Sequence, residues 1–274
     1  MGYDFLEASN DIDYGDIVIV GYPFDSTSSF RSGSRKGPFS LRYHSWNLET
    51  FSPYRKIDIH TKKYSDIGDM ELPFGNIEKT NSMVYENTKR LLKMKKQVIA
   101  LGGEHSITFP IIKAYSEIYD DFIMVVFDAH ADLRNDYQGV QFSHACVIKN
   151  CADIITSKRI CQLGVRSYTE EEWNYSKNML YFSDTINDFD FSILKNKKIY
   201  LSIDVDVLDP SIVSGTGTPE PGGIFFKDFI DFLIRFKEFD VIGCDVVELS
   251  PDYDLSDVSS ITAAKIVREL ILLL

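Results

Sequence analysis

Short apolar runs rich in Val and Ile recur along the chain, and stretches with a helical spacing of apolar residues separate them. Most positions within each run are apolar, rather than every second one, which is typical of strands buried on both faces of a parallel sheet. The pattern predicts strands at residues 17–20, 97–101, 122–127, 159–163, 199–203 and 241–247.

Three further segments have the periodicity of helices. Residues 81–96 are polar on one side and apolar on the other, and residues 225–236 repeat Phe and Leu at three- and four-residue steps. Residues 262–274 end in an apolar run that predicts the buried face of a last helix. Strands and helices alternate without a repeat or a long linker, so we expect a single α/β domain over residues 1–274, with three α/β/α layers and a mainly parallel sheet.

The charge of the chain narrows the range of partners. Lys and Arg number 29 against 41 Asp and Glu, which gives a net charge of −12. Such a surface repels phosphate backbones and anionic lipid, so we expect neither nucleic acid nor a membrane as a partner. The same charge attracts cations, either metal ions or small basic molecules.

The location of the protein is predicted from what the sequence lacks. No apolar run approaches the roughly 18 residues of a membrane span, and residues 1–10 have neither the basic nor the apolar part of a signal peptide. The four cysteines form no C-x-x-C pair and are too sparse for a disulfide framework. We therefore predict reduced, structural thiols in a cytoplasmic protein.

Acidic residues and histidines follow four of the predicted strands, at the sheet edge where ligands bind in open α/β folds. The strand at 122–127 leads into Asp128, His130 and Asp132, which can project together because alternate residues of an extended chain point the same way. The other three strands lead into His105, into Asp204 and Asp206, and into Glu248.

This cluster predicts a site for two metal ions. One Asp or His at a strand end is usually a turn or capping residue, but clustered carboxylates stay ionised in an interior only beside positive charge. Four carboxylates and two neutral imidazoles carry a charge of −4, which two divalent cations balance. Carboxylate-rich donors favour a hard or borderline ion such as Mn²⁺ over structural zinc. Because a two-metal site generates hydroxide at neutral pH, the inferred chemistry is hydrolysis.

The stretches that carry these residues resemble the ureohydrolases, the arginase and agmatinase family. They are GGEHS (102–106), FDAHADLR (127–134), SIDVDVLDP (202–210) and DVVELSP (245–251). Enzymes of this family use a dinuclear manganese centre to hydrolyse guanidino compounds to an amine and urea. The resemblance therefore implies an arginase/deacetylase-like fold, two Mn²⁺ per chain, a small cationic guanidino substrate and a homotrimer or homohexamer.

The resemblance also implies a role for each site residue. His105, Asp128, Asp132 and Asp204 would hold one manganese ion, and Asp128, His130, Asp204 and Asp206 the other. A metal-bridging hydroxide would attack the guanidinium carbon, Glu248 would bind the guanidinium, and Asp132 would pass a proton to the leaving amine. His144 would lie at the pocket and bind substrate or transfer protons. Glu104 departs from the Asp of the family pattern, and we expect it to support its neighbour His105.

Within the family the chain resembles the agmatinase branch. The segments concerned are GYPFDSTSSFRSGSRKGP (21–38), SHACVIKN (143–150), GVRS (164–167) and GTGTPEPGG (215–223). The loop at 135–142 is shorter than the arginase loop that holds the α-carboxylate of arginine, and agmatine has no such carboxylate. The predicted function is therefore manganese-dependent hydrolysis of agmatine to putrescine and urea, in polyamine biosynthesis.

Several alternatives remain open. Arginase, guanidinobutyrase or formiminoglutamase activity would need a cation at the pocket rim, for which Arg134 and Arg166 are candidates. A zinc amidohydrolase of the deacetylase type shares the fold but uses a pair of adjacent histidines that this chain lacks, and a non-catalytic family member would have lost metal ligands. We expect the Glu170–Glu172 run to be a solvated helix start, and the glycine-rich residues 215–217 to form a loop near the site.

Overall fold

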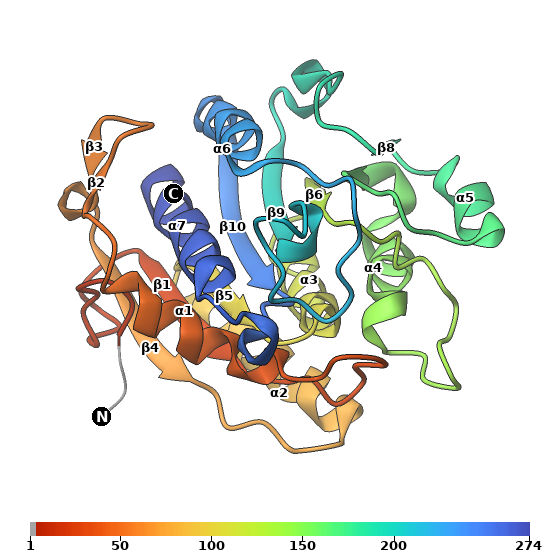
Figure 1. Cartoon of the computed structure of the whole chain (residues 1–274), viewed down its shortest axis with the longest axis horizontal. Coiled ribbons are helices and arrows are strands. Elements are labelled where there is room, and N and C mark those ends of the chain that lie inside the picture. Colours follow the sequence, from red (N-terminus) through yellow and green to blue (C-terminus); the bar gives the residue numbers. More distant parts are fainter. Residues whose placement is uncertain (1–3) are drawn as a thin grey trace.

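A parallel sheet of eight strands forms the centre of the computed structural model, which describes residues 4–274 (Figure 1). Residues 1–3 of the N-terminal segment considered above lie outside the described residues. The strand order is β4-β1-β5-β10-β9-β6-β7-β8, and each neighbouring pair of these strands is parallel. The strands are β1 (Ile17–Tyr22), β4 (Tyr64–Asp69), β5 (Gln97–Gly102), β6 (Phe122–Phe127), β7 (Ile160–Leu163), β8 (Tyr181–Ser183), β9 (Lys198–Asp204) and β10 (Asp240–Val247).

Both faces of the sheet are buried, which explains the continuous apolar runs. In β1, Ile17 and Ile19 pack into the core on one face, whereas Val18 and Val20 pack into the core on the other. Successive side chains of a strand point to opposite faces, so a strand covered on both sides needs apolar residues at every position. The three-layer α/β/α arrangement that the sequence predicts is confirmed.

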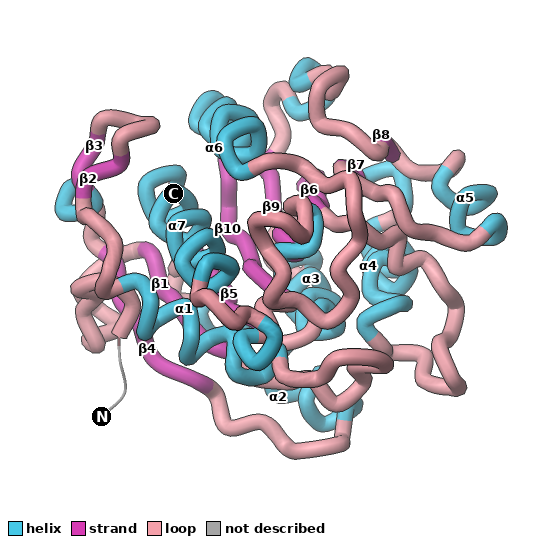
Figure 2. Tube along the Cα trace, viewed as in Figure 1, coloured by secondary structure: helices cyan, strands magenta, loops and turns pink. Residues whose placement is uncertain are grey.

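Helices cover each face of the sheet (Figure 1). The near layer holds α1 (Gly37–Ser45), α6 (Phe226–Ile234) and α7 (Val258–Leu273), and the far layer holds α2 (Ile77–Lys93), α3 (Thr108–Ser116) and α4 (Val147–Ile155). The short helix α5 (Glu170–Ser176) lies near the β8 edge, and β2 (Phe51–Ser52) pairs with β3 (Ile57–Asp58) in a separate small hairpin. Long loops join β6 to α4 and β9 to α6 (Figure 2).

The predicted elements are present, with shifted ends. The helix predicted at 81–96 begins four residues earlier, at Ile77, because the Asn76 side chain accepts a hydrogen bond from the Lys79 backbone N–H and caps the first turn. The helix start expected at Glu170–Glu172 is the first turn of α5, but the pattern did not reveal the edge strands β4 and β8 or the short helices α1, α3 and α4. Strand β4 reads Tyr-Ser-Asp-Ile-Gly-Asp, and its buried Ser65 and Asp66 hide the apolar signal.

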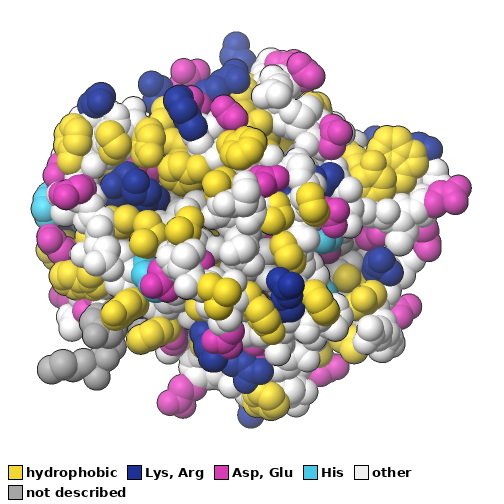
Figure 3. All heavy atoms as spheres, viewed as in Figure 1, with side chains coloured by type: hydrophobic (Ala, Val, Ile, Leu, Met, Phe, Trp, Pro, Cys, Tyr) yellow, Lys and Arg dark blue, Asp and Glu magenta, His cyan; other side chains and the backbone are white. Residues whose placement is uncertain are grey.

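The structure also bears on the expected state of the cysteines, the expected absence of a membrane span and the charge of the surface. The four cysteines are buried free thiols. No helix among the described residues combines the length and the hydrophobicity needed to cross a bilayer. On the face shown in Figure 3, basic side chains lie scattered among acidic and apolar ones.

A buried ion pair fastens α1 to the edge strand β4. Arg42 is 4% exposed, and its Nε and Nη2 atoms donate to the two carboxylate oxygens of Asp66 at 2.7 and 2.9 Å. Its Nη1 donates to Asp69. Removing one partner of such a pair leaves a charge in the interior without compensation.

We predict that Arg42→Ala lowers the free energy of unfolding by about 3–5 kcal/mol. The control is Lys227→Ala, which removes an ion pair with Asp231 whose side chains are 78% and 54% exposed. That change should cost less than about 1 kcal/mol, because water screens exposed pairs. Urea unfolding of both variants measures the difference, and equal small losses would contradict the anchoring role of Arg42.

Candidate metal centre

Four neighbouring strands in the middle of the sheet end at one edge, and their following residues meet there. His105 begins a one-turn helix after β5, and Asp128 follows β6 directly. Asp204 is the last residue of β9, with Asp206 in the turn that follows, and Glu248 follows β10. Because the strands are parallel, their carboxyl ends bring these five residues together from distant parts of the sequence.

Asp128 lies between two histidines. Its Oδ2 is 3.0 Å from His105 Nδ1, and its Oδ1 is 3.6 Å from His130 Nδ1. Two groups of donor atoms suited to a metal ion share this carboxylate, one with His105 and Asp132 and the other with His130 and Asp206. A carboxylate that serves two adjacent groups is the arrangement expected of a two-metal site.

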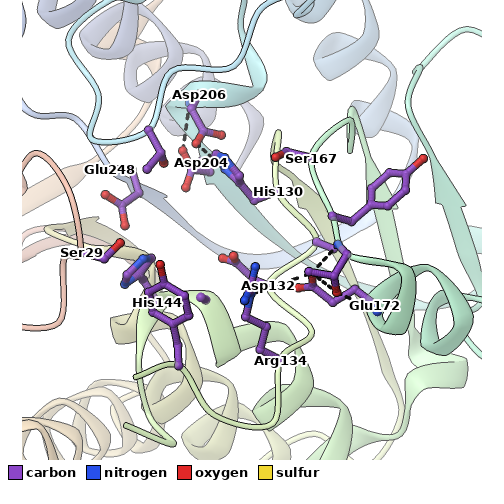
Figure 4. Close-up of a pocket in the computed structure, with 16 residues that line it drawn as sticks. Ser29, His130, Asp132, Arg134, His144, Ser167, Glu172, Asp204, Asp206 and Glu248 are labelled. Atoms are coloured by element: carbon purple, nitrogen blue, oxygen red, sulfur yellow. Dashed lines mark hydrogen bonds and ion pairs between the residues drawn. The ribbon is translucent and has the colours of Figure 1, made fainter. Parts of the chain in front are cut away.

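The other predicted ligands lie close to the same histidines, and Figure 4 shows Asp204 and Asp206 beside His130. Asp206 Oδ2 is 2.9 Å from His130 Nδ1, while Asp132 Oδ2 and Asp204 Oδ2 lie 3.4 and 3.5 Å from His105 Nδ1. Asp204 Oδ1 accepts the Asp206 backbone N–H at 2.9 Å. The six residues predicted as metal ligands therefore form one cluster.

Several donor atoms of this cluster are buried and have no hydrogen-bond partner among the described residues. They are His105 Nδ1, Asp128 Oδ2 and Asp206 Oδ2. His105 belongs to one donor group, Asp206 to the other, and Asp128 to both. A buried polar atom without a partner is costly, and such atoms are rare in folded proteins. Metal ions would satisfy all three atoms, so the donor set fits a metal centre.

The charges of the cluster move the pKa values of its members. Burial alone would lower the pKa of His105, but Asp128 and Asp132 raise it well above its usual range. Against the same effect of burial, Asp206 and Asp128 raise the pKa of His130 to about 12. Burial and the Asp128 charge raise the pKa of Asp132 to about 7. The cluster thus attracts positive charge, and a divalent cation would compete with these protons.

A buried hydrogen-bond chain orients His105 from behind. Its Nε2 lies 3.1 Å from Ser202 Oγ, which donates to Asp245 Oδ1 at 2.7 Å. Tyr200 donates its hydroxyl to the other oxygen of Asp245, also at 2.7 Å. Because these partners hold Nε2, the imidazole presents Nδ1 to Asp128, in the manner of metal-ligating histidines.

The backbone of Asp132 adopts a left-handed conformation, with φ of 52°. Its carbonyl accepts the N–H groups of Ile148 and Lys149 at 3.1 and 3.2 Å, and the next N–H, that of Leu133, donates to Glu172 Oε1 at 3.1 Å. A non-glycine residue in this region costs of order 1–3 kcal/mol, and it persists where the surroundings hold it. Here α4 and Glu172 hold the turn that aims Asp132 at the site.

Glu248 has a similar left-handed backbone, with φ of 65°. Its N–H donates to the Gly103 carbonyl at 2.8 Å, and its Oε1 accepts the His105 N–H at 2.7 Å. A guanidinium bound to both carboxylate oxygens of Glu248 would therefore share Oε1 with the His105 backbone N–H. Burial and the charge of Glu104 raise the pKa of the Glu248 carboxyl well above its usual range, which a bound cation would reverse.

An acidic cleft opens over the cluster (Figure 4). Asp132, Asp204, Asp206 and Glu248 line it, together with His130 and His144. His144 lies beside Ser29 in this view, and burial lowers its pKa to about 4, so its imidazole is neutral. Thr218, next to the glycine-rich 215–217 segment, also lines the cleft, so that segment forms a loop near the site as expected.

The two arginines proposed as cations at the pocket rim differ in whether their guanidinium groups are free to meet a substrate carboxylate. Arg134 lines the cleft, with its guanidinium 5.0 Å from the centre of the Tyr137 ring. Arg166 instead donates to backbone carbonyls, which belong to Gly164, Asp206, Val207, Glu220 and Pro221. Arg166 therefore holds loops together, and Arg134 is the cation among the described cleft residues that could meet a substrate carboxylate.

Two residues of the site were not anticipated. Glu170 and Glu171 are exposed as expected, but Glu172 is buried in the cleft wall, where it forms a capping box with Thr169. The Thr-x-x-Glu spacing is the sequence signal that could have separated Glu172 from its neighbours. Thr27, which contacts both Glu104 and His144, carries no comparable signal.

Comparison with known proteins places this geometry in a family. Residues 15–273 match the arginase family. An agmatinase of Bacillus anthracis is 38% identical over 278 residues, which cover 99% of this chain and 96% of that protein. An N(1)-aminopropylagmatine ureohydrolase of Thermococcus kodakarensis is 35% identical, with 91% of this chain and 87% of that protein covered.

A solved structure agrees with these sequence matches. The agmatine ureohydrolase of Thermoplasma volcanium superposes with a TM-score of 0.90 at 32% identity, over 99% of this chain and 94% of that chain. The matches extend across the strands, the loops and the acidic cluster alike. This chain therefore belongs to the arginase family and is a ureohydrolase enzyme.

Proposed function

We propose that this enzyme hydrolyses agmatine to putrescine and urea with two Mn²⁺ ions. The observation that carries the proposal is the Asp128 carboxylate, with one oxygen near His105 and the other near His130. Two overlapping donor groups beneath one acidic cleft are suited to a pair of divalent ions and a cationic substrate.

The proposed ligands are those that the family resemblance implies, and the two donor groups around Asp128 support all of them except Asp204, which neither group contains. His105, Asp128, Asp132 and Asp204 would hold one ion, and Asp128, His130, Asp204 and Asp206 the other. Donors that are mostly carboxylate oxygens favour Mn²⁺ over structural zinc. When bound, two such ions supply hydroxide at neutral pH as the nucleophile for hydrolysis.

The remaining cleft residues would bind the substrate and move protons. Glu248 would accept hydrogen bonds from the planar guanidinium, as carboxylates do from arginine. The Asp132 carboxylate would pass a proton to the leaving amine, and His144, which lines the same cleft, would bind the substrate or transfer protons. The buried walls would keep the guanidinium in a fixed position relative to these groups.

The choice of agmatine rests on charge. Two metal ions would neutralise Asp132, Asp204 and Asp206, which leaves Glu172 and Glu248 against Arg134 among the charged residues that line the cleft. Arg166 is occupied by carbonyl groups, so a cationic substrate suits the cleft better than one with a carboxylate. The agmatinase of Bacillus anthracis supports the same choice. The relative from Thermococcus kodakarensis makes N(1)-aminopropylagmatine, a longer cation, the second candidate substrate.

Location and assembly remain predictions. The buried free thiols suit the reducing conditions of a cytoplasm. A homotrimer or homohexamer follows from the family resemblance alone.

The first test compares substrates. Protein loaded with Mn²⁺ should release urea from agmatine at least about 100-fold more efficiently, by kcat/KM, than from arginine or 4-guanidinobutyrate, because these carry a carboxylate into an acidic cleft. N(1)-aminopropylagmatine belongs in the same panel. A preference for a carboxylate-bearing substrate would overturn the choice of agmatine, and Arg134→Ala should then raise the KM for that substrate.

The second test removes the shared carboxylate. Asp128→Asn should lower urea release at least about 100-fold and reduce bound manganese below two ions per chain, since one side chain serves both donor groups. The control is Asp153→Asn, which changes an exposed carboxylate paired with Lys149 and should retain wild-type activity and metal. Full manganese content in Asp128→Asn, measured by mass spectrometry, would contradict the two-metal proposal.

A further inference from the structure

Glu104 is a fully buried carboxylate that the proposed mechanism does not use. The chain brings it to residues 24–27 because Gly103 has no side chain: a Cβ there would lie 2.0 Å from the Phe24 carbonyl oxygen. The Glu104 N–H donates to that same carbonyl at 2.7 Å. The backbone thus holds Glu104 against the segment that contains Thr27.

Four donors surround the Glu104 carboxylate. Oε2 accepts the Thr27 backbone N–H at 2.8 Å and the Ser28 hydroxyl at 3.3 Å. Oε1 accepts the hydroxyls of Thr27 and Ser106, each at 2.5 Å. Burial raises the pKa of Glu104, and the hydrogen bonds from Ser106 and Thr27 oppose that rise.

The hydrogen bond from the Thr27 hydroxyl to Glu104 determines whether that hydroxyl can donate to His144 or only accept from it. A hydroxyl has one proton, and that of Thr27 points to Glu104 Oε1, so toward His144 the Thr27 oxygen has only lone pairs. Accordingly, it accepts the His144 backbone N–H at 3.2 Å. The same oxygen lies 3.5 Å from His144 Nδ1, an approach that is favourable only when Nδ1 carries a proton.

The His144 ring is confined in this orientation. The Tyr137 ring packs against it edge-on, with centroids 5.8 Å apart and planes at 77°. The imidazole lies in the cleft wall (Figure 4). In a neutral imidazole with a protonated Nδ1, the second nitrogen, Nε2, has a lone pair.

We propose that Glu104, acting through Thr27, holds His144 in the Nδ1-protonated neutral form, so that Nε2 faces the cleft as a hydrogen-bond acceptor. Glu104 and Thr27 are then positioning residues for His144. The inference rests on the proposed function for its catalytic meaning: His144 would accept an N–H of the guanidinium or of the amine instead of donating to it. The lowered pKa of His144, caused mainly by burial, agrees with a neutral ring.

Replacing Glu104 by glutamine should reverse the hydrogen bond between residue 104 and the Thr27 hydroxyl, and with it the one between that hydroxyl and His144 Nδ1. The Thr27 backbone N–H needs an acceptor, so the amide oxygen of the introduced glutamine would occupy the place of Oε2 and its NH₂ group the place of Oε1. That NH₂ group would donate to the Thr27 hydroxyl, and the hydroxyl proton would then turn to His144 Nδ1. Glu104→Gln should therefore convert His144 to the Nε2-protonated form without changing the size of any side chain.

The test is NMR of the full chain labelled with ¹⁵N-histidine and prepared without manganese. The chain has five histidines, and His144→Gln assigns the signal of interest. We expect a protonated Nδ1 in the wild type and a protonated Nε2 in Glu104→Gln. A wild-type protein with a protonated Nε2, or an unchanged tautomer in Glu104→Gln, would overturn the proposal.

Variants of the intermediate residue provide matched controls. Thr27→Val removes the hydroxyl at constant shape and keeps the backbone bond to Glu104, so it should abolish the preference for a protonated Nδ1, whereas Thr27→Ser should preserve it. Ser28→Ala removes a hydrogen bond to Glu104 that does not reach His144, and the tautomer should stay as in the wild type. A tautomer change in Ser28→Ala equal to that in Thr27→Val would count against the proposal.

Kinetics then examine the consequence for the reaction. On the substrate that the panel identifies, kcat should fall about 10-fold or more in Glu104→Gln and Thr27→Val at unchanged manganese content, and Thr27→Ser should restore it to within about threefold. Wild-type kcat in Glu104→Gln would overturn the positioning role. Because the tautomer is measured without substrate or manganese, failure of the proposed activity would not be confused with failure of this inference.

Discussion

Repulsion among buried carboxylates is the constraint on which the rest of this site depends. Asp128, Asp132, Asp204 and Asp206 lie within one small cluster, together with two imidazoles. Two like charges 4 Å apart repel by about 4 kcal/mol at the effective dielectric of a protein, so the cluster is tolerable only with protons or cations among the oxygens. Its affinity for metal and its share in the stability of the fold are therefore two aspects of one interaction.

The parallel sheet supplies the rigidity that this repulsion requires. The ends of β5, β10, β9 and β6 are tied into one hydrogen-bonded ladder with apolar cores on both faces, so the carboxylates cannot move apart. At Asp132 and Glu248 the chain turns away from the sheet with a left-handed backbone. N–H groups of α4 donate to the Asp132 carbonyl, while Glu172 accepts the Leu133 N–H and the Gly103 carbonyl accepts the Glu248 N–H. Hydrogen bonds outside the cluster thus determine where its side chains point.

Much of the site could be predicted from the sequence because it depends on the order of residues within short segments. An apolar strand followed by Asp128, His130 and Asp132 places charge at a sheet edge in any parallel α/β fold. The edge strands β4 and β8 could not be predicted in this way. Strand β4 contains the buried Asp66, whose charge is compensated by Arg42 from a distant segment, and β8 has only three residues. Glu172 was wrongly predicted to be exposed to solvent, because a run of three glutamates is typical of a solvated helix start. Only the fold shows which of the three side chains faces inward.

By itself, the sequence determined the fold class, the layer order and the composition of the acidic cluster, because periodicity and the residues at strand ends are properties of short segments. Only the tertiary structure decided how those segments meet. It placed Arg166 under backbone carbonyls instead of at the rim, and it set Thr27 between Glu104 and His144, which are 40 positions apart in the sequence. The physical reason is that hydrogen-bond partners separated by many residues are chosen by packing, and packing depends on the whole chain at once.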